Sequence, residues 1–291
     1  MNRAASDESD SRAEAGAASQ TLDRAFQLVR FISASRGEGM ALSDLVRASG
    51  LTKPTARRLL VSLIANGLIE QEAQSRRYHL GPEIYLLGVM ADERFGIQRL
   101  AAGSLVRLAA ASGDAALLSV QRGMETICLA REEGSYPLRS HVLQPGDRHP
   151  LGGGAAGVAL LAGLPDDEIE EILATHGERL SAAYLSPTQL REQVAITRRC
   201  GYALNAGYVF KGSWGVAVSF RDLRTGLHAA LTIAGVESRF TDTRIKELVA
   251  LLQEEKFHLE QVLARPGKPS PTGAQQTAPL PARLSSRKTT L

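Results

Sequence analysis

Apolar residues recur at helical spacing in the first part of the chain. Intervals of three and four predict an amphipathic helix whose inner face carries Leu22, Ala25, Phe26, Val29 and Ile32.

A short second helix follows, with Leu42, Leu45 and Val46 inward. Gly50 suits the positive φ of a tight turn. Thr52 and Pro54 suit the start of a third helix whose core positions are Ala56, Leu59, Leu60, Leu63 and Ile64.

Two short segments after the third helix predict a hairpin. Residues 68–70 and 76–80 read as strands around the turn 73–75. Two helices joined by a tight turn and followed by a hairpin predict a winged helix-turn-helix over residues 21–81. A further helix around 83–95 would link this head to the rest of the chain.

The pattern changes after residue 96. Helical periodicity predicts helices over 97–111, 155–162, 166–176, 187–200 and 242–263. Strand pairs are predicted at 115–121 with 126–131, and at 214–221 with 228–234. Strand pairs beside helices indicate an α+β fold with an antiparallel sheet for residues 82–264.

The outer face of the third helix is basic. A recognition helix presents its first two turns to the DNA major groove, and the positive end of its dipole attracts phosphate. The residues expected at this face are Thr52, Lys53, Thr55, Arg57 and Arg58, with Arg76 and Arg77 at the base of the wing. The alternative for the two wing arginines is an ordinary solvated hairpin.

Charge is unevenly distributed along the chain, whose net charge is +3. Residues 21–81 carry nine Lys and Arg against five Asp and Glu, whereas residues 82–264 carry eighteen against twenty-two. A basic head beside an acidic main body is typical of a polyanion-binding module on a separate sensor domain. The ends, 1–20 and 265–291, are polar or rich in proline and are expected to be disordered.

Several protein classes receive no support. No run of 18 apolar residues predicts a membrane span, and the N-terminal residues lack the apolar segment of a signal peptide. Cys128 and Cys200 form no CxxC pair, which suits a reducing cytoplasm, and the six His form no metal-binding spacing. We therefore expect a cytoplasmic protein without metal or cofactor. Without a GxSxG elbow or a close Cys/His arrangement, we also expect no enzymatic activity.

A glycine-rich segment, 152–157, matches GxGxxG. It follows Arg148-His149-Pro150 instead of an apolar strand, so a dinucleotide site is not indicated. Glycines before an apolar helix nevertheless expose backbone N–H groups at a positive helix end, which predicts a carboxylate or phosphate site. The alternative is a turn that only packs closely against the sheet.

Longer segments carry a specific resemblance. The order TLDRAFQLVRFIS, LSDLVRASGLTKPTARRLLVSLIANGLIE and RRYHLGPEIYLLG resembles the head of the isocitrate lyase regulator (IclR) family. The resemblance continues through HPLGGGAAGVALLAGLP, TRRCGYALNAG and GVAVSFRDLRTGLHAALTIAGVESRFTDTR, and so covers about residues 20–263. It implies a GAF-like effector-binding domain and a transcription regulator of catabolic genes that responds to a small organic acid.

The resemblance also implies the positions of the effector. The loop before residue 155 would donate backbone amides to a small acid, and the implied pocket positions are Ala155, Ala156, Asn205, Gly215, Thr232 and Ala234. The chain departs from its relatives at Gly152 and Val158, where a His and a Lys are usual, and only Thr232 keeps a hydroxyl. With Trp214 as an apolar wall, these departures favour an aromatic or branched acid over a two-carbon acid.

The resemblance and the geometry of short recognition helices imply partners. One such helix reads few bases, so a palindromic operator bound by a homodimer or a dimer of dimers is expected. Ile84, Leu87 and Met90 or Ala91 on the linker helix are the expected dimer contact. Two other functions stay open at this stage: an enzyme with a DNA-binding-like accessory head, and a winged helix that docks another protein.

Overall fold

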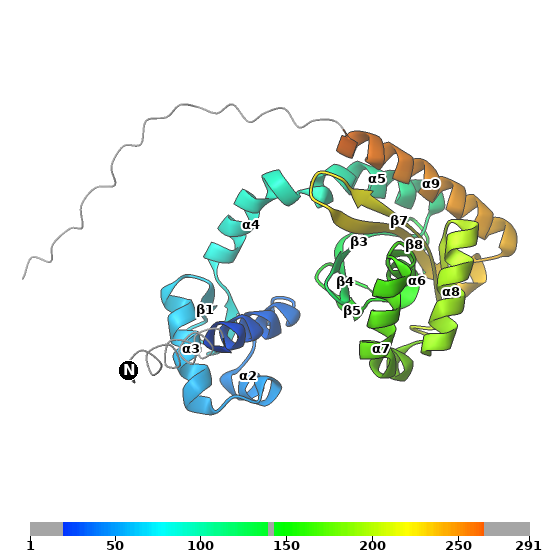
Figure 1. Ribbon diagram of the computed structural model, residues 1–291. Helices are drawn as coiled ribbons and strands as arrows, with labels where there is room; N and C mark the ends of the chain where they lie inside the picture. Colours follow the sequence, from blue (N-terminus) through cyan, green and yellow to red (C-terminus); the bar gives the residue numbers. More distant parts are fainter. Residues whose placement is uncertain (1–19, 139–142, 265–291) are drawn as a thin grey trace, which may run out of the picture.

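The computed structural model describes residues 20–138 and 143–264 (Figure 1). The segments expected to be disordered lie outside these residues, except residue 20, which is helical. Within the described part of the head, a helix spans 20–34 and is followed by α2 (Leu42–Ser49), α3 (Lys53–Ala65), β1 (Ile69–Gln71) and β2 (Tyr78–Leu80). β1 and β2 pair antiparallel, as the predicted wing requires.

The head has a small apolar core of its own. Leu28, Leu45 and Leu60 are fully buried there, and Gly50 ends α2 with a left-handed φ of 67°. The predicted inner face of the first helix is right for Ile32, which is buried, and for Ala25 and Val29, which pack against the core, but Leu22 and Phe26 are exposed and Leu28 is buried instead. Ile64 is also exposed, contrary to expectation. The predicted and observed inner faces of that helix overlap and differ by a small rotation, which its packing partners determine.

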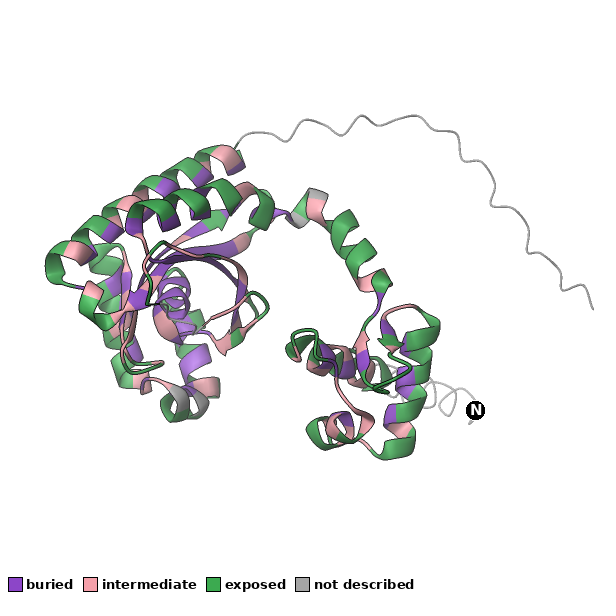
Figure 2. Ribbon diagram, turned by 180° about the vertical axis from the view of Figure 1, so that it is seen from behind, coloured by how far each residue is buried: buried purple, intermediate pink, exposed green. Residues whose placement is uncertain are grey.

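A helix of unusual exposure joins the head to the second domain. α4 (Pro82–Phe95) has no buried residue among those described on it, and Figure 2 shows it exposed along most of its length. Its exposed large apolar side chains are Tyr85, Leu86, Leu87, Val89 and Met90. Gly96 is the single residue between α4 and α5 (Ile97–Ser112).

The second domain is built on one antiparallel sheet, which confirms the predicted α+β fold. Its strand order is β5-β4-β3-β8-β7-β6. The strands are β3 (Ala115–Arg122), β4 (Glu125–Glu132), β5 (Arg148–Pro150), β6 (Ala203–Ala206), β7 (Ser213–Asp222) and β8 (Leu227–Val236). The two edge strands β5 and β6 are too short to show alternation, and the sequence did not predict them.

Helices cover both faces of this sheet (Figure 1). α5 and α9 (Asp242–Ala264) pack on one face, and α6 (Gly154–Ala162) packs on the other with α8 (Pro187–Cys200) beside it. α7 (Asp166–Ala183) contacts α8. Successive side chains along β7 point alternately to these two faces. Val216, Val218 and Phe220 belong to the core under α5 and α9, whereas Ala217 packs under α6.

A buried histidine lies at one end of the sheet. His228 on β8 is bonded through Nδ1 to Oε1 of Gln121, at 3.2 Å. Burial, aided by the charges of Arg221 and Lys256, lowers the pKa of His228 to about 4. Gly163 touches this ring so closely that a Cβ there would lie 2.4 Å from its Cε1.

The low pKa of His228 makes stability depend on pH. Its imidazole takes up a proton near pH 6.5 in the unfolded chain but only near about 4 in the folded one. The unfolded state therefore binds more protons between these values, and the free energy of unfolding should fall as the pH is lowered from about 6.5 to about 4. Urea unfolding of the His228→Gln variant should show a free energy of unfolding that depends less on pH over this range.

The pH range of the His228 effect lies above the range in which the carboxylates act. The pKa of Asp222 is lowered, as is that of Glu255, so their contributions are lost only below about pH 4.5. His149, whose pKa burial also lowers, acts in the same direction as His228 and explains any slope that remains in the variant. If the free energy of unfolding changes equally with pH in the variant and the wild type above about pH 5, the pH dependence does not come from His228.

Candidate functional sites

The first turns of α3 form a basic, open surface on the head. Lys53, Arg57 and Arg58 are exposed, and α3 has no acidic residue in its first turn. None of the three forms an ion pair within the described residues. Thr52 stands at the N-cap position, but its hydroxyl does not cap the helix as expected. It lies 2.9 Å from the hydroxyl of Thr55, so the two form one polar pair at the helix start.

The two wing arginines differ in their surroundings. Arg76 is exposed and has a positive φ of 58°, which places it at the tight end of the hairpin. Arg77 donates from Nη1 to the carbonyl oxygens of Gly39, at 2.9 Å, and Glu38, at 3.5 Å. Arg77 therefore anchors the wing to the loop before α2, and Arg76 is the freer of the two to meet a phosphate.

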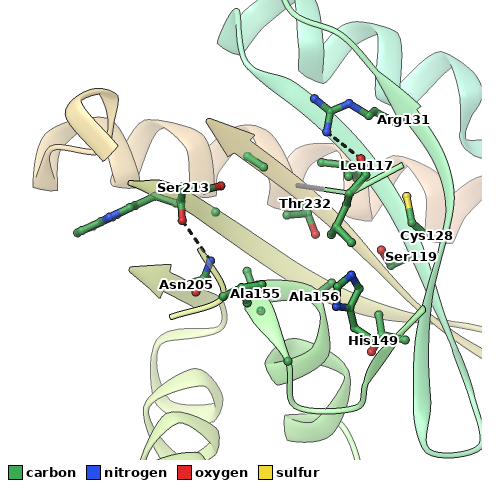
Figure 3. Close-up of a pocket in the computed structure, with 18 residues that line it drawn as sticks. Leu117, Ser119, Cys128, Arg131, His149, Ala155, Ala156, Asn205, Ser213 and Thr232 are labelled. Carbon is green, nitrogen blue, oxygen red and sulfur yellow. Dashed lines mark hydrogen bonds between the residues drawn. The ribbon is translucent and has the colours of Figure 1, made fainter. Parts of the chain in front are cut away.

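A cavity lies on the α6 side of the sheet, where the curled strands and the start of α6 enclose it (Figure 3). All seven residues predicted for an effector site line it: Ala155, Ala156, Asn205, Trp214, Gly215, Thr232 and Ala234. Residues up to 79 positions apart in sequence, from Ala155 to Ala234, thus meet at one place. Their role in binding stays a prediction.

The start of α6 supplies the cavity with backbone donors. The first N–H groups of a helix have no partner within the helix. α6 has no side-chain cap and no acid in its first turn, and no acidic side chain among the described residues lines the cavity. Gly152 and Gly154 have positive φ values of 97° and 67°, which turn the chain sharply into the helix. The arrangement presents a positive helix end to an enclosed space.

Two hydroxyl groups in the cavity wall have no hydrogen-bond partner within the part of the chain that the structure describes. The side chains of Thr126 and Thr232 are each 5% exposed, and the Oγ1 atom of each is unsatisfied. A buried polar group without a partner costs about 1–3 kcal/mol. Such groups are rare in folded proteins, and here both face the same cavity. They are therefore suited to a ligand that supplies the missing bonds.

Several cavity residues were missed by sequence reasoning. They are Leu117, Ser119, Thr126, Cys128, Arg131, Leu143, His149, Val209 and Ser213. Alternation along β3 and β4 could have placed Ser119, Thr126 and Cys128 on one face. A bulge in β4, where Leu118 pairs with Ala130 but Ser119 pairs with Cys128, brings Arg131 to that face as well. No sequence signal marks that bulge.

The ionisable groups of the cavity are largely neutralised. Arg131, 4% exposed, forms an ion pair with Glu133 at 2.7 Å and donates to the carbonyl oxygen of Leu143 at 2.9 Å. Burial raises the pKa of the Cys128 thiol to about 12, so this group stays protonated. Burial also lowers the pKa of His149, which keeps its imidazole uncharged at neutral pH. The amide end of α6 is thus the main uncompensated positive feature.

Trp214 does not form the expected apolar wall. Its ring packs in the core under α5 and α9, with its centroid 6.2 Å from that of Phe240. Gly215, the next residue, faces the cavity instead, since a Cβ there would lie 3.8 Å from that of Ala155. Alternation along β7 places consecutive side chains on opposite faces, so Trp214 borders the cavity through its backbone.

The cavity is small. Its volume is about 60 Å3. One water occupies about 10–15 Å3 on this scale, and an apolar cavity of about 150 Å3 holds benzene. This volume is closer to the size of an acid of a few carbon atoms than to that of an aromatic acid, and the identity of the effector stays a prediction.

Comparison with known protein families assigns both parts of the chain. The model of the IclR helix-turn-helix domain matches residues 21–73, and that of the bacterial transcriptional regulator IclR C-terminal region matches residues 90–256. The chain belongs to the IclR family. It is therefore a DNA-binding transcription regulator with an effector-binding domain.

Individual relatives agree with this assignment. The chain is 28% identical over 231 residues to the HTH-type transcriptional regulator BhcR of Paracoccus denitrificans, covering 79% of this chain and 82% of the relative. A crystal structure of an IclR-type regulator from Silicibacter sp. superposes with a TM-score of 0.71 at 24% identity, over 86% and 98% of the two chains. The crystal structure of an IclR homologue from Microbacterium hydrocarbonoxydans, complexed with 4-hydroxybenzoate, superposes with a TM-score of 0.70 at 22% identity, over 84% of this chain and 98% of that chain.

The described residues contain neither a membrane-spanning helix nor a cluster of metal ligands. No helix there is long and apolar enough to cross a membrane. No group of three or more His, Cys, Asp or Glu side chains within the same part of the chain could hold a metal ion.

The unsatisfied hydroxyl of Thr232 gives a testable consequence. Replacing Thr232 with Val keeps the shape and removes the orphan hydroxyl, so the ligand-free protein should be more stable by about 1 kcal/mol. Urea unfolding measures this difference. Thr197→Val is the matched control, because Thr197 on α8 also has a buried, unsatisfied Oγ1 but does not line the cavity. A loss of stability in Thr232→Val alone would mean that its hydroxyl is already bonded in solution.

Proposed function

We propose that the protein binds a pseudo-palindromic operator as a homodimer or a pair of dimers, and that a small carboxylic acid in the cavity changes its operator affinity. The observation that carries this proposal is the uncapped start of α6, which opens into a cavity with two orphan hydroxyls. The genes controlled would be catabolic, as the family resemblance suggests.

The DNA side of the proposal rests on the basic face of α3. Arg57 and Arg58 are exposed on its first two turns, within reach of base edges when the helix lies in a major groove. Arg76 would contact a phosphate beside the groove. Arg77, engaged by the carbonyls of Glu38 and Gly39, would act chiefly by holding the wing in place.

The dimer is supported by α4. A helix with five exposed large apolar side chains is costly in water unless a partner covers it. A second copy of α4 would bury the same residues on both sides, as a two-fold interface requires. The predicted contact thus includes Leu87 and Met90, extended by Tyr85, Leu86 and Val89.

The ligand side rests on charge and size. The carboxylate of the acid would accept hydrogen bonds from the N–H groups of Ala155 and Ala156, while Thr232 and Asn205 bond the rest. An IclR homologue complexed with 4-hydroxybenzoate supports an organic acid as the ligand class. The volume of about 60 Å3 in this chain supports a shorter acid.

Two connections could carry a signal from the cavity to the head. One is α4. The other is an ion pair between Arg36 and Asp147, 2.5 Å apart, in which the arginine side chain is 58% exposed. An exposed ion pair contributes about 0–1 kcal/mol, whereas couplings between sites are typically about 1–3 kcal/mol. The proposal therefore assigns the main route to α4.

Substitutions in the head should separate base reading from phosphate binding. Arg57→Ala should weaken operator binding by about 1–3 kcal/mol and relax sequence preference, because a bidentate contact to a guanine would be lost. Arg76→Ala should weaken all sequences alike and reduce the salt slope by about one phosphate contact. Gel shifts at several salt concentrations measure both effects.

Arg47 provides the control for these variants. It is exposed on α2 and paired with Asp44, away from the first turns of α3. Arg47→Ala should leave affinity and preference unchanged. If Arg57→Ala and Arg58→Ala both behave like Arg47→Ala, α3 is not the reading helix.

Filling the cavity should uncouple the ligand from DNA binding. A side chain at Gly215 would enter the space between Ala155 and Thr232, with its Cβ at ordinary contact distances of 3.5–3.8 Å. Gly215→Val should keep operator affinity and lose the response to acids, and Gly215→Ala should keep part of it. Operator affinity with and without short carboxylic acids measures this, with circular dichroism as the control for folding. A full response in a folded Gly215→Val variant would place the ligand elsewhere.

A further inference from the structure

An exposed valine stands in the middle of the outer face of α3. The side chain of Val61 is 59% exposed. The buried residues of the helix lie on the opposite face and are Ala56, Leu59, Leu60 and Leu63. At about 100° per residue, Val61 points about 150° away from the centre of that buried face. Figure 1 shows α3 on the side of the head away from the effector domain, so this outer face is open to a partner.

Helix stability gives no reason for a valine at this position. A β-branched side chain has restricted χ1 freedom in a helix, and valine is a weaker helix former than alanine. The apolar core of the head does not include Val61. Its isopropyl group stays in water and contributes no burial energy to the folded chain. Val61 is therefore either a tolerated surface residue or a contact for a partner.

Two cations flank this valine. Arg57 lies one turn before Val61 and about 40° to one side of it around the helix axis, and Arg58 lies about 60° to the other side. Both arginines are exposed. The core of a protein–protein interface is depleted in charged residues, whereas the DNA major groove places its base edges between two rows of phosphates. An apolar group between two exposed cations therefore fits DNA better than it fits another protein.

The major groove offers such a side chain one apolar group, the C5-methyl of thymine. The other groups on the base edges are hydrogen-bond donors and acceptors, which a valine cannot satisfy. The helical rise places Val61 about 6 Å further along α3 than Arg57, and stacked base pairs are about 3.4 Å apart. The thymine should therefore lie within about two base pairs of the guanine that Arg57 is proposed to read.

We infer that Val61 reads the C5-methyl group of a thymine in each half-site of the operator, and so determines sequence specificity at one base pair. This inference rests on the proposed function, in which α3 lies in the major groove. Burial of one methyl group changes affinity about fourfold, which corresponds to about 0.8 kcal/mol. Two half-sites that contribute independently give a change of roughly tenfold to twentyfold.

Deoxyuridine tests the contact, because it pairs as thymine does and lacks only the C5-methyl group. The full-length protein first selects its operator from random DNA. Each symmetric pair of thymines is then replaced with deoxyuridine, and the affinity is measured by fluorescence anisotropy. The wild type should lose affinity roughly tenfold to twentyfold at one pair of positions. That pair should lie within about two base pairs of the position at which Arg57→Ala relaxes sequence preference.

Val61→Ala should remove this dependence on the methyl group. Alanine is the better helix former, so the variant should fold at least as well as the wild type. It should bind the thymine operator about as weakly as the wild type binds the deoxyuridine operator, and it should not distinguish the two. Val61→Thr keeps one of the two side-chain methyl groups and should keep part of the difference.

A second exposed valine provides the matched control. Val106 is 53% exposed on α5 of the effector domain. Val106→Ala removes the same two methyl groups from a helix surface that is no part of the head. It should leave the ratio of thymine to deoxyuridine affinity as it is in the wild type.

The outcomes distinguish this inference from the function on which it rests. If the wild type selects no sequence from random DNA, the proposed operator function and the inference both fail. If it binds a selected operator but tolerates deoxyuridine at every position, only the inference is wrong. A deoxyuridine effect of equal size in Val61→Ala would come from the shape of the DNA and also overturns the inference. If Val61→Ala binds every operator as the wild type does, the exposed valine does not contact DNA and would serve a protein partner instead.

Discussion

The effector domain depends on the close packing of α6 against the inner face of the sheet. Every residue of α6 from Ala155 to Ala162 is buried, and the helix is built from small and aliphatic side chains. The strands beneath it are correspondingly small, with Gly215, Ala217 and Ala230 at the contact. This close approach removes the start of the helix from bulk water, and its free N–H groups must then find partners within the domain or in a ligand.

The two faces of the sheet differ in the size of the side chains they carry. The face under α5 and α9 is filled by large aliphatic and aromatic side chains, including Phe220 and the ring of Trp214, and forms a continuous core. The α6 face carries smaller side chains and leaves a cavity. Polar groups gather there because each strand places every second residue on that side. The bulge in β4 adds Arg131, which ties the cavity wall to the segment around Leu143.

The head and the effector domain are chemically distinct. The head has a small core of its own and a basic helix whose cations stay open to solvent. The effector domain pairs most of its buried charges, as with Arg239 and Asp114 at 2.7 Å. α4 connects them with an exposed apolar surface. In the proposed dimer a second copy of α4 would cover this surface.

Local chemistry determined much of this protein. The winged head, the turn at Gly50, the basic face of α3, the glycine-rich entry into α6 and the two long hairpins follow from periodicity, turn residues and charge, which act between neighbours in sequence. Six of the seven residues expected in the pocket came from family resemblance and Trp214 from its residue type, and all seven line one cavity.

Tertiary structure decided what depends on contacts between distant segments. It buried Leu28 in the core of the head and left Leu22 and Phe26 exposed, because the exact facing of the first helix depends on its packing partners. It turned the Trp214 ring away from the cavity, and it paired β5, too short to be recognised alone, with β4. That pairing sets His149 beside Thr126. No local pattern encodes it, since its stability comes from neighbours that only the folded chain brings together.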